Sequence, residues 1–150
     1  MNERALIGKC GLYCGACAVY RVARDGDGEA EKFAARFNCP VEKVKCNGCG
    51  DLLEDSWGLD CKIVSCLRDK GLKYCYECPE YDARSCEKYE HISQGYAEDG
   101  VDTRANLSSI CEGREDEWLA EQRKFFTCSH CGNPVIVGRD TCHHCSRPVR

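Results

Sequence analysis

Apolar side chains recur with the period of an α-helix in several separate stretches of the chain. The clearest of the early stripes, at the spacing i, i+3, i+4, i+7, is formed by Ala30, Phe33, Ala34 and Phe37. This pattern predicts an amphipathic helix that ends at Asn38-Cys39-Pro40. Residues 16–24 and 61–70 show shorter helical patterns, and Gly71 directly after the second is a typical helix end.

A longer helical pattern covers residues 115–126. Its stripe is formed by Trp118, Leu119, Gln122, Phe125 and Phe126. Acidic residues occupy the first turn and two basic residues lie near the end, which is the charge order that the helix dipole favours. We expect this helix to pack on the preceding part of the chain and to connect it to a C-terminal tail.

Two segments depart from the helical pattern. Residues 95–101 are polar and contain two glycines, which predicts a flexible boundary. Residues 134–137 are strand-like and Gly138-Arg139-Asp140 can reverse the chain, which predicts a β-hairpin. The pattern therefore predicts a small α+β protein: a helical domain over residues 1–94, a flexible segment and connecting helix over 95–127, and a hairpin tail over 128–150.

The apolar content is low for a folded chain of this length. Leu, Ile, Val and Phe supply 27 of the 150 residues, a share at which burial alone can fail to stabilise a fold. Structural zinc sites contribute on the order of 10 kcal/mol that is coupled directly to folding. With 16 cysteines in the chain, we expect metal to replace part of the missing core, and most of the chain to be unfolded without it.

Whether the many cysteines are disulfide partners or metal ligands depends on the redox compartment of the protein. No apolar segment typical of a secretory signal follows the first residues, and no run of 18 apolar residues occurs. We therefore expect a cytoplasmic protein, in which clustered cysteines are metal ligands rather than disulfide partners.

The strongest metal motif lies in the tail. Cys128-x2-Cys131 and Cys142-x2-Cys145 are separated by ten residues, which is the spacing of a zinc ribbon. Each Cys-x-x-Cys turn brings two sulfurs to one ion, and two turns complete a tetrahedron. Because four thiolates suffice, the neighbouring histidines are predicted to face solvent; these are His130, His143 and His144.

The first part of the chain contains ten further clustered cysteines. They are Cys10, Cys14, Cys17, Cys46, Cys49, Cys61, Cys66, Cys75, Cys78 and Cys86. We expect two four-thiolate sites among them, with the rest free or at a third site, so that the chain holds three or more zinc ions. Cys39 and Cys111 stand apart, and the spacing does not determine which cysteines share a metal.

Iron–sulfur ligation stays open as an alternative for this part of the chain, because it uses the same thiolates. The ferredoxin run Cys-x2-Cys-x2-Cys-x3-Cys-Pro is absent, which favours zinc. In either case an apolar lid over the centre is predicted from Leu52, Leu53, Trp57 and Leu59.

The opening segment Cys10-Gly-Leu-Tyr-Cys14-Gly-Ala-Cys17-Ala-Val-Tyr20 resembles that of an uncharacterised cysteine-rich family, domain-of-unknown-function family 3795. The resemblance continues through the cysteine pairs 46/49, 61/66 and 75/78 to Cys86, over about residues 8–92. It implies a zinc-binding prokaryotic protein and carries no known activity. The chain departs from the family pattern at Arg84-Ser85-Cys86, where the family usually has Tyr-Pro-Cys.

No catalytic set is predicted. A Ser-His-Asp arrangement, a P-loop and a dinucleotide fingerprint are all absent, and closed thiolate sites offer no position for a substrate. We expect an adaptor or regulatory module that binds an unknown protein partner, with an anaerobe's iron–sulfur redox protein as the alternative. The formal net charge of −4 disfavours nucleic acid overall, although the basic tail leaves that partner open.

Overall fold

The computed structural model describes residues 3–25, 28–52, 56 and 61–149. Seven α-helices lie within these ranges: α1 (Ala18–Asp25), α2 (Glu29–Arg36), α3 (Lys62–Lys70), α4 (Pro79–Asp82), α5 (Glu87–Glu98), α6 (Thr103–Cys111) and α7 (Glu115–Phe125). Short 3-10 helices include η1 (Glu3–Leu6), η2 (Cys14–Ala16), η3 (Val41–Lys43) and η5 (Cys75–Glu77).

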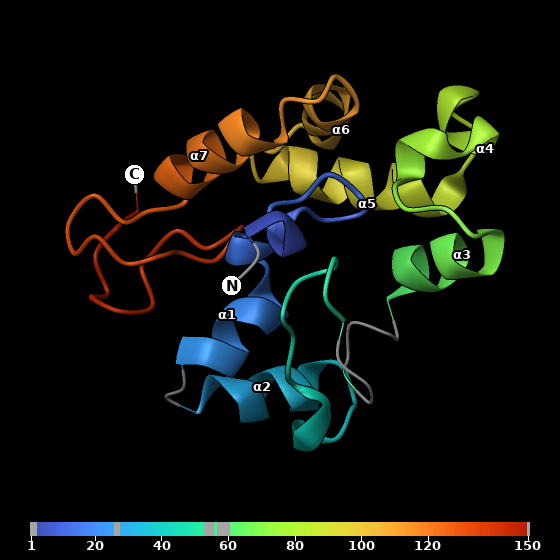
Figure 1. Cartoon of the computed structure of the whole chain (residues 1–150). Coiled ribbons are helices and arrows are strands. Elements are labelled where there is room, and N and C mark those ends of the chain that lie inside the picture. The colour runs from blue at the N-terminus through green and yellow to red at the C-terminus, as the bar shows by residue number, and fades with distance from the viewer. Residues whose placement is uncertain (1–2, 26–27, 53–55, 57–60, 150) are drawn as a thin grey trace.

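The N-terminal segment runs through the middle of the molecule. Figure 1 shows α5, α6 and α7 on one side of this segment and the α1–α2 pair on the other. Helices α3 and α4 lie at one end of the assembly, and the C-terminal tail lies at the opposite end, next to α7 and α1. The chain therefore places its first cysteines at the centre and its last cysteines at one end.

The helices expected from the apolar periodicity over 16–24, 30–37, 61–70 and 115–126 are confirmed as α1, α2, α3 and α7. Gly71 caps α3 in the left-handed conformation, with φ of 68°. The sequence pattern does not reveal α6, whose apolar positions are few. That helix begins at an Asp102 side chain that accepts a hydrogen bond from the Ala105 N–H at 3.0 Å.

Two apolar clusters form the interior. The larger one surrounds the N-terminal segment and contains Ile7, Tyr13, Leu107, Trp118 and Phe126. The smaller one lies between α1 and α2 and contains Val19, Val22, Phe33, Val44 and Ile136. Cys128 and Cys142 are buried members of the larger cluster, so the tail packs against the interior that the N-terminal segment and α7 share.

The prediction of an α+β fold with a C-terminal β-hairpin is wrong. Over the ranges described above, the structure contains helices and three isolated bridges (Ile7–Tyr13, Thr127–Pro134 and Thr141–Pro148) but no strand.

The tail segment 134–137 lies between the two clusters. Val135 packs in the larger cluster and its neighbour Ile136 in the smaller one. The backbone of this segment makes hydrogen bonds to two different parts of the chain: Val135 N–H donates to the Phe126 carbonyl and Val137 N–H to the Ala16 carbonyl. The bridges Thr127–Pro134 and Thr141–Pro148 each close one cysteine turn, so neither pairs the segment 134–137 with the chain that follows Gly138-Arg139-Asp140.

Two other expectations concern loops. The predicted lid falls mostly on residues 53–55 and 57–60, which lie outside the described part of the chain. The expected flexible boundary at 95–101 begins inside α5, which continues to Glu98. None of the helices in the described ranges has the length and apolar character needed to cross a membrane.

Candidate metal centres

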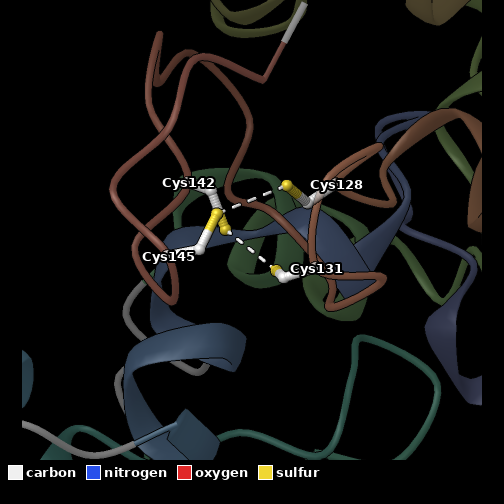
Figure 2. A group of neighbouring side chains, drawn as sticks. All are labelled: Cys128, Cys131, Cys142 and Cys145. Atoms are coloured by element: carbon white, nitrogen blue, oxygen red, sulfur yellow. Dashed lines mark hydrogen bonds between the residues drawn. The ribbon is translucent and has the colours of Figure 1, made fainter.

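The four tail cysteines converge on one point. All four Sγ atoms lie within 4.8 Å of one another, with Cys128–Cys145 at 3.8 Å and Cys131–Cys142 at 3.7 Å (Figure 2). A disulfide would bring two sulfurs to about 2.05 Å. Zinc–sulfur bonds of about 2.3 Å in a tetrahedron place the sulfurs about 3.8 Å apart. The cluster therefore has the dimensions of a single four-thiolate metal site.

Two backbone turns of the same design present these sulfurs. In the first, Cys128 N–H donates to the Asn133 carbonyl and Gly132 N–H to the Cys128 carbonyl. In the second, Cys142 N–H donates to the Arg147 carbonyl and Ser146 N–H to the Cys142 carbonyl. Gly132 and Ser146 both adopt positive φ, of 75° and 63°. The sequence carries this design as a repeat, Thr-Cys-x-His-Cys-x-x-Pro-Val at 127–135 and Thr-Cys-x-His-Cys-x-x-Pro-Val at 141–149.

The turns also set the electrostatics of the thiols. Backbone N–H groups of Cys131 and His130 lower the pKa of Cys128 to about 7. The Arg147 N–H favours the Cys145 thiolate, but burial and the three neighbouring thiols outweigh it and raise the pKa of Cys145 to about 11. Four thiols this close cannot all ionise without a cation, and a divalent ion removes that repulsion.

A second set of cysteines lines one small cavity. Cys66 on α3, Cys75 and Cys78 at η5, and Cys86 before α5 surround a space of about 20 Å³. That volume suits one water-sized group. Burial and the thiols of Cys86, Cys66 and Cys78 raise the pKa of Cys75 to about 12. Lys70 also lines this cavity, and its ammonium lies 3.3 Å from the Cys78 sulfur.

The opening cysteines gather with those of residues 46–61 at the centre of the molecule. Cys49 N–H donates to the Cys14 sulfur at 3.4 Å. The hydrogen bond between these two thiols raises the pKa of Cys14 and lowers that of Cys49. Burial and the thiol of Cys49 raise the pKa of Cys17 to about 12, and burial together with Cys49, Cys61 and Cys75 raises that of Cys10. Burial, together with the thiols of Cys49 and Cys61, raises the pKa of Cys46.

This central set is more widely spread than the tail site. In the part of the chain that the structure describes, two groups bring three or more ligand atoms within 4.8 Å of one another, and neither includes these cysteines. Cys66 lies within α3 and lines the cavity, whereas Cys61, at the N-cap of α3, adds to burial in raising the pKa of thiols in both sets, Cys46 and Cys75. Cys39 packs against the smaller apolar cluster and Cys111 is exposed at the end of α6, apart from all three sets.

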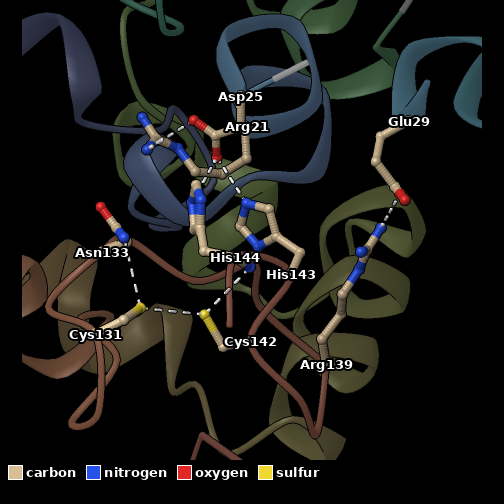
Figure 3. Close-up of polar contacts among 9 residues, drawn as sticks. All are labelled: Arg21, Asp25, Glu29, Cys131, Asn133, Arg139, Cys142, His143 and His144. Carbon is tan, nitrogen blue, oxygen red and sulfur yellow. Dashed lines mark hydrogen bonds and ion pairs between the residues drawn. The ribbon is translucent and has the colours of Figure 1, made fainter. Parts of the chain in front are cut away.

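The second compact group was not foreseen from the sequence. Asp25 lies at the end of α1, and its Oδ2 is 2.6 Å from His143 Nε2 and 3.3 Å from His144 Nε2 (Figure 3). The His143 side chain is only 9% exposed, so the prediction that it faces solvent is wrong. His130 is exposed, as predicted. A separation of 118 positions hides this contact from any local sequence pattern.

Comparison with protein families gives one match. A family described as "Protein of unknown function (DUF3795)" matches residues 6–91, more than half of the chain. The chain belongs to this family. The DUF3795 region contains the central set and the Cys66 cavity, whereas the tail site and α7 lie beyond it. Neither the search of curated proteins nor the search of solved structures returned a match.

Proposed function

We propose that this DUF3795 protein is a zinc protein whose metal ions are structural and whose folded surface serves as a binding or regulatory module for another protein. The observation that carries the proposal is the spacing of the tail sulfurs at 3.7–3.8 Å. That spacing fits one tetrahedral ion, whereas an iron–sulfur cluster places a separate iron under each thiolate and spreads the sulfurs further apart. Four thiolates leave no open position, so the ion supports structure.

The burial of the ligands supports a structural role. Cys128 and Cys142 are 1% and 0% exposed and pack in the larger apolar cluster. A metal ion there ties the tail to the interior that α7 and the N-terminal segment share. We extend the proposal to the Cys66, Cys75, Cys78 and Cys86 cavity, where one ion would link α3, η5 and the start of α5.

The central set supports a second candidate for its own metal. Six thiols gather there, from Cys10, Cys14, Cys17, Cys46, Cys49 and Cys61, which is more than one zinc ion requires. Six thiols exceed the four ligands that an iron–sulfur cluster takes, which supports such a cluster as the second candidate at the centre of the molecule. Zinc at the tail site and at the Cys66 cavity is compatible with either zinc or an iron–sulfur cluster at the central set.

The surface charge favours a protein partner over nucleic acid. Two of the five basic residues that follow residue 121 are engaged with acids of the helical body, Arg123 with Glu3 and Arg139 with Glu29. Each zinc ion held by four thiolates adds a charge of −2 to its site. The tail therefore presents a weaker positive surface than its sequence suggests.

Cobalt substitution tests the closed character of the tail site. Co²⁺ bound by four thiolates gives strong sulfur-to-cobalt charge-transfer absorption, and a closed site leaves that spectrum unchanged when azide is added. We expect no azide effect on this absorption. A spectrum that shifts with azide would reveal an open position and contradict a purely structural role. Iron and sulfide analysis of the anaerobically purified protein tests the second candidate.

A further inference from the structure

The group formed by Asp25, His143 and His144 has the composition of a metal site that is separate from the thiolates. Two imidazoles and one carboxylate are ligands that zinc accepts, whereas magnesium and calcium prefer oxygen alone. Both imidazoles point at the same carboxylate from the second cysteine turn (Figure 3). The three ligand atoms lie within 4.8 Å of one another.

The distances suit a tetrahedral ion. Bonds of about 2.0–2.1 Å to nitrogen and oxygen place the ligand atoms about 3.3 Å apart. His144 Nε2 and Asp25 Oδ2 are already at 3.3 Å. His143 Nε2 and Asp25 Oδ2, at 2.6 Å, would have to separate by about 0.7 Å, which a small side-chain rotation supplies.

The surroundings orient the ligands. Arg21 is buried on α1, and its Nη1 lies 3.7 Å from Asp25 Oδ1, which directs the other oxygen, Oδ2, toward the histidines. Metal-bound carboxylates are held in this way by an outer partner. The side chains of Asp25 and His143 are 15% and 9% exposed, and that of His144 is 25% exposed. A fourth ligand, such as water, can therefore approach from the His144 side.

The charge of the neighbouring thiolate site also favours a cation at this position, and this step rests on the proposed function of the tail. His144 N–H donates to the Cys142 sulfur at 3.4 Å, so the two groups are adjacent. A zinc ion with four thiolates carries a net charge of −2, which favours a second divalent cation nearby.

We propose that Asp25, His143 and His144 form a second metal site that binds a zinc-like divalent ion with three protein ligands and one open position. The site joins the end of α1, inside the DUF3795 region, to the tail beyond it. Three protein ligands with an open fourth position distinguish this site from the closed thiolate site beside it.

The repeat in the tail provides a matched control. His130 occupies in the first cysteine turn the position that His144 occupies in the second, and it is exposed. The full chain, dialysed against buffered free zinc, is analysed for zinc per chain by mass spectrometry. Asp25→Asn and His144→Ala should each lose one zinc ion per chain, and His130→Ala should lose none. An unchanged zinc content in both Asp25→Asn and His144→Ala overturns the proposal, and the three side chains would then only hydrogen-bond the tail to α1.

Cobalt separates this proposal from that for the tail. The sulfur-to-cobalt absorption of the four-thiolate site should persist in Asp25→Asn and His144→Ala. If either variant also loses that absorption, the wild-type chain decides the question. Stepwise addition of a chelator should first remove one cobalt ion without loss of the sulfur-to-cobalt absorption. If each cobalt ion removed, from the first onward, is accompanied by a proportional loss of the sulfur-to-cobalt absorption, the proposal of a second site is wrong.

Discussion

Asp25 Oδ2 lies 2.6 Å from His143 Nε2, which fastens the second cysteine turn to the end of α1. A second contact lies close by, where Arg139 donates to Glu29 at the start of α2 at 3.1 Å. Three residues before Arg139, Ile136 is buried in the smaller apolar cluster with side chains of α1 and α2. The tail is thus bound to α1 and α2 by both polar and apolar contacts, and their contributions to the free energy of unfolding can be compared.

We predict that the apolar contact dominates. Ile136 is 3% exposed, and Ile136→Ala should lower the free energy of unfolding by about 2–4 kcal/mol through lost burial and a residual cavity. Arg139→Ala removes a partly exposed ion pair and should cost less than about 1 kcal/mol. Urea unfolding of the metal-loaded proteins, followed by circular dichroism, measures both. A larger loss for Arg139→Ala would show that the ion pair, rather than the buried side chain, holds the tail.

Glycine at position 11 is required by a close backbone contact. Its φ is 94°, and a Cβ atom there would lie 2.4 Å from the Thr103 carbonyl oxygen at the start of α6. Gly11→Ala should therefore destabilise the protein by at least about 2–3 kcal/mol. Gly95 lies within α5 with nothing near its Cβ position, so Gly95→Ala should stabilise by about 0.5–1 kcal/mol. Thermal unfolding of both variants checks the pair, and equal effects would contradict the close contact.

The cavity of Cys66, Cys75, Cys78 and Cys86 predicts a specific metal loss. Cys75→Ser should remove one metal ion per chain, because a neutral hydroxyl does not replace a thiolate ligand. Cys39→Ser is the control, since Cys39 lies with the smaller apolar cluster and should not change the metal content. Metal analysis of the two proteins distinguishes them. Equal metal content would remove this cavity from the set of sites.

Proton release should report the low pKa of Cys128. Metal binding requires thiolates, so each thiol still protonated at the working pH releases a proton. The pKa of Cys128 is lowered to about 7 by backbone N–H groups. Below pH 7 this thiol must give up a proton, and well above pH 7 it is already a thiolate. Zinc binding at the tail should therefore release roughly one proton fewer at pH 8 than at pH 6.

Calorimetry in buffers of different ionisation enthalpy measures this proton count. The titration uses chain from which only the tail zinc has been removed, so that the turn around Cys128 stays folded, and the Cys128→Ser variant serves as the control that lacks the group. A count in the wild type that is the same at pH 6 and pH 8 would contradict a lowered pKa for Cys128.

Local patterns predicted the local structure well. The stripe through Phe33 gave α2, Gly71 gave the end of α3, and the tail Cys-x-x-Cys pairs gave a compact four-sulfur group. The predicted hairpin is wrong because the isolated bridges Thr127–Pro134 and Thr141–Pro148 lie within the two cysteine turns and do not join one turn to the other. The Asp25–His143 contact depends on how α1 meets the tail, which no short-range spacing encodes. The ligand roles of the other cysteines and the three-part division of the chain stay predictions.

Metal analysis of the wild type beside Cys142→Ser tests the central claim most directly. Cys142 is fully buried at the tail site, so its loss should abolish that site alone among the thiolate sites. After anaerobic purification we predict zinc in the wild type, with at least one zinc ion fewer per chain in Cys142→Ser. Equal zinc content in the two proteins would contradict a structural zinc site in the tail. So would a wild type that holds iron, and not zinc, as the metal that Cys142→Ser loses.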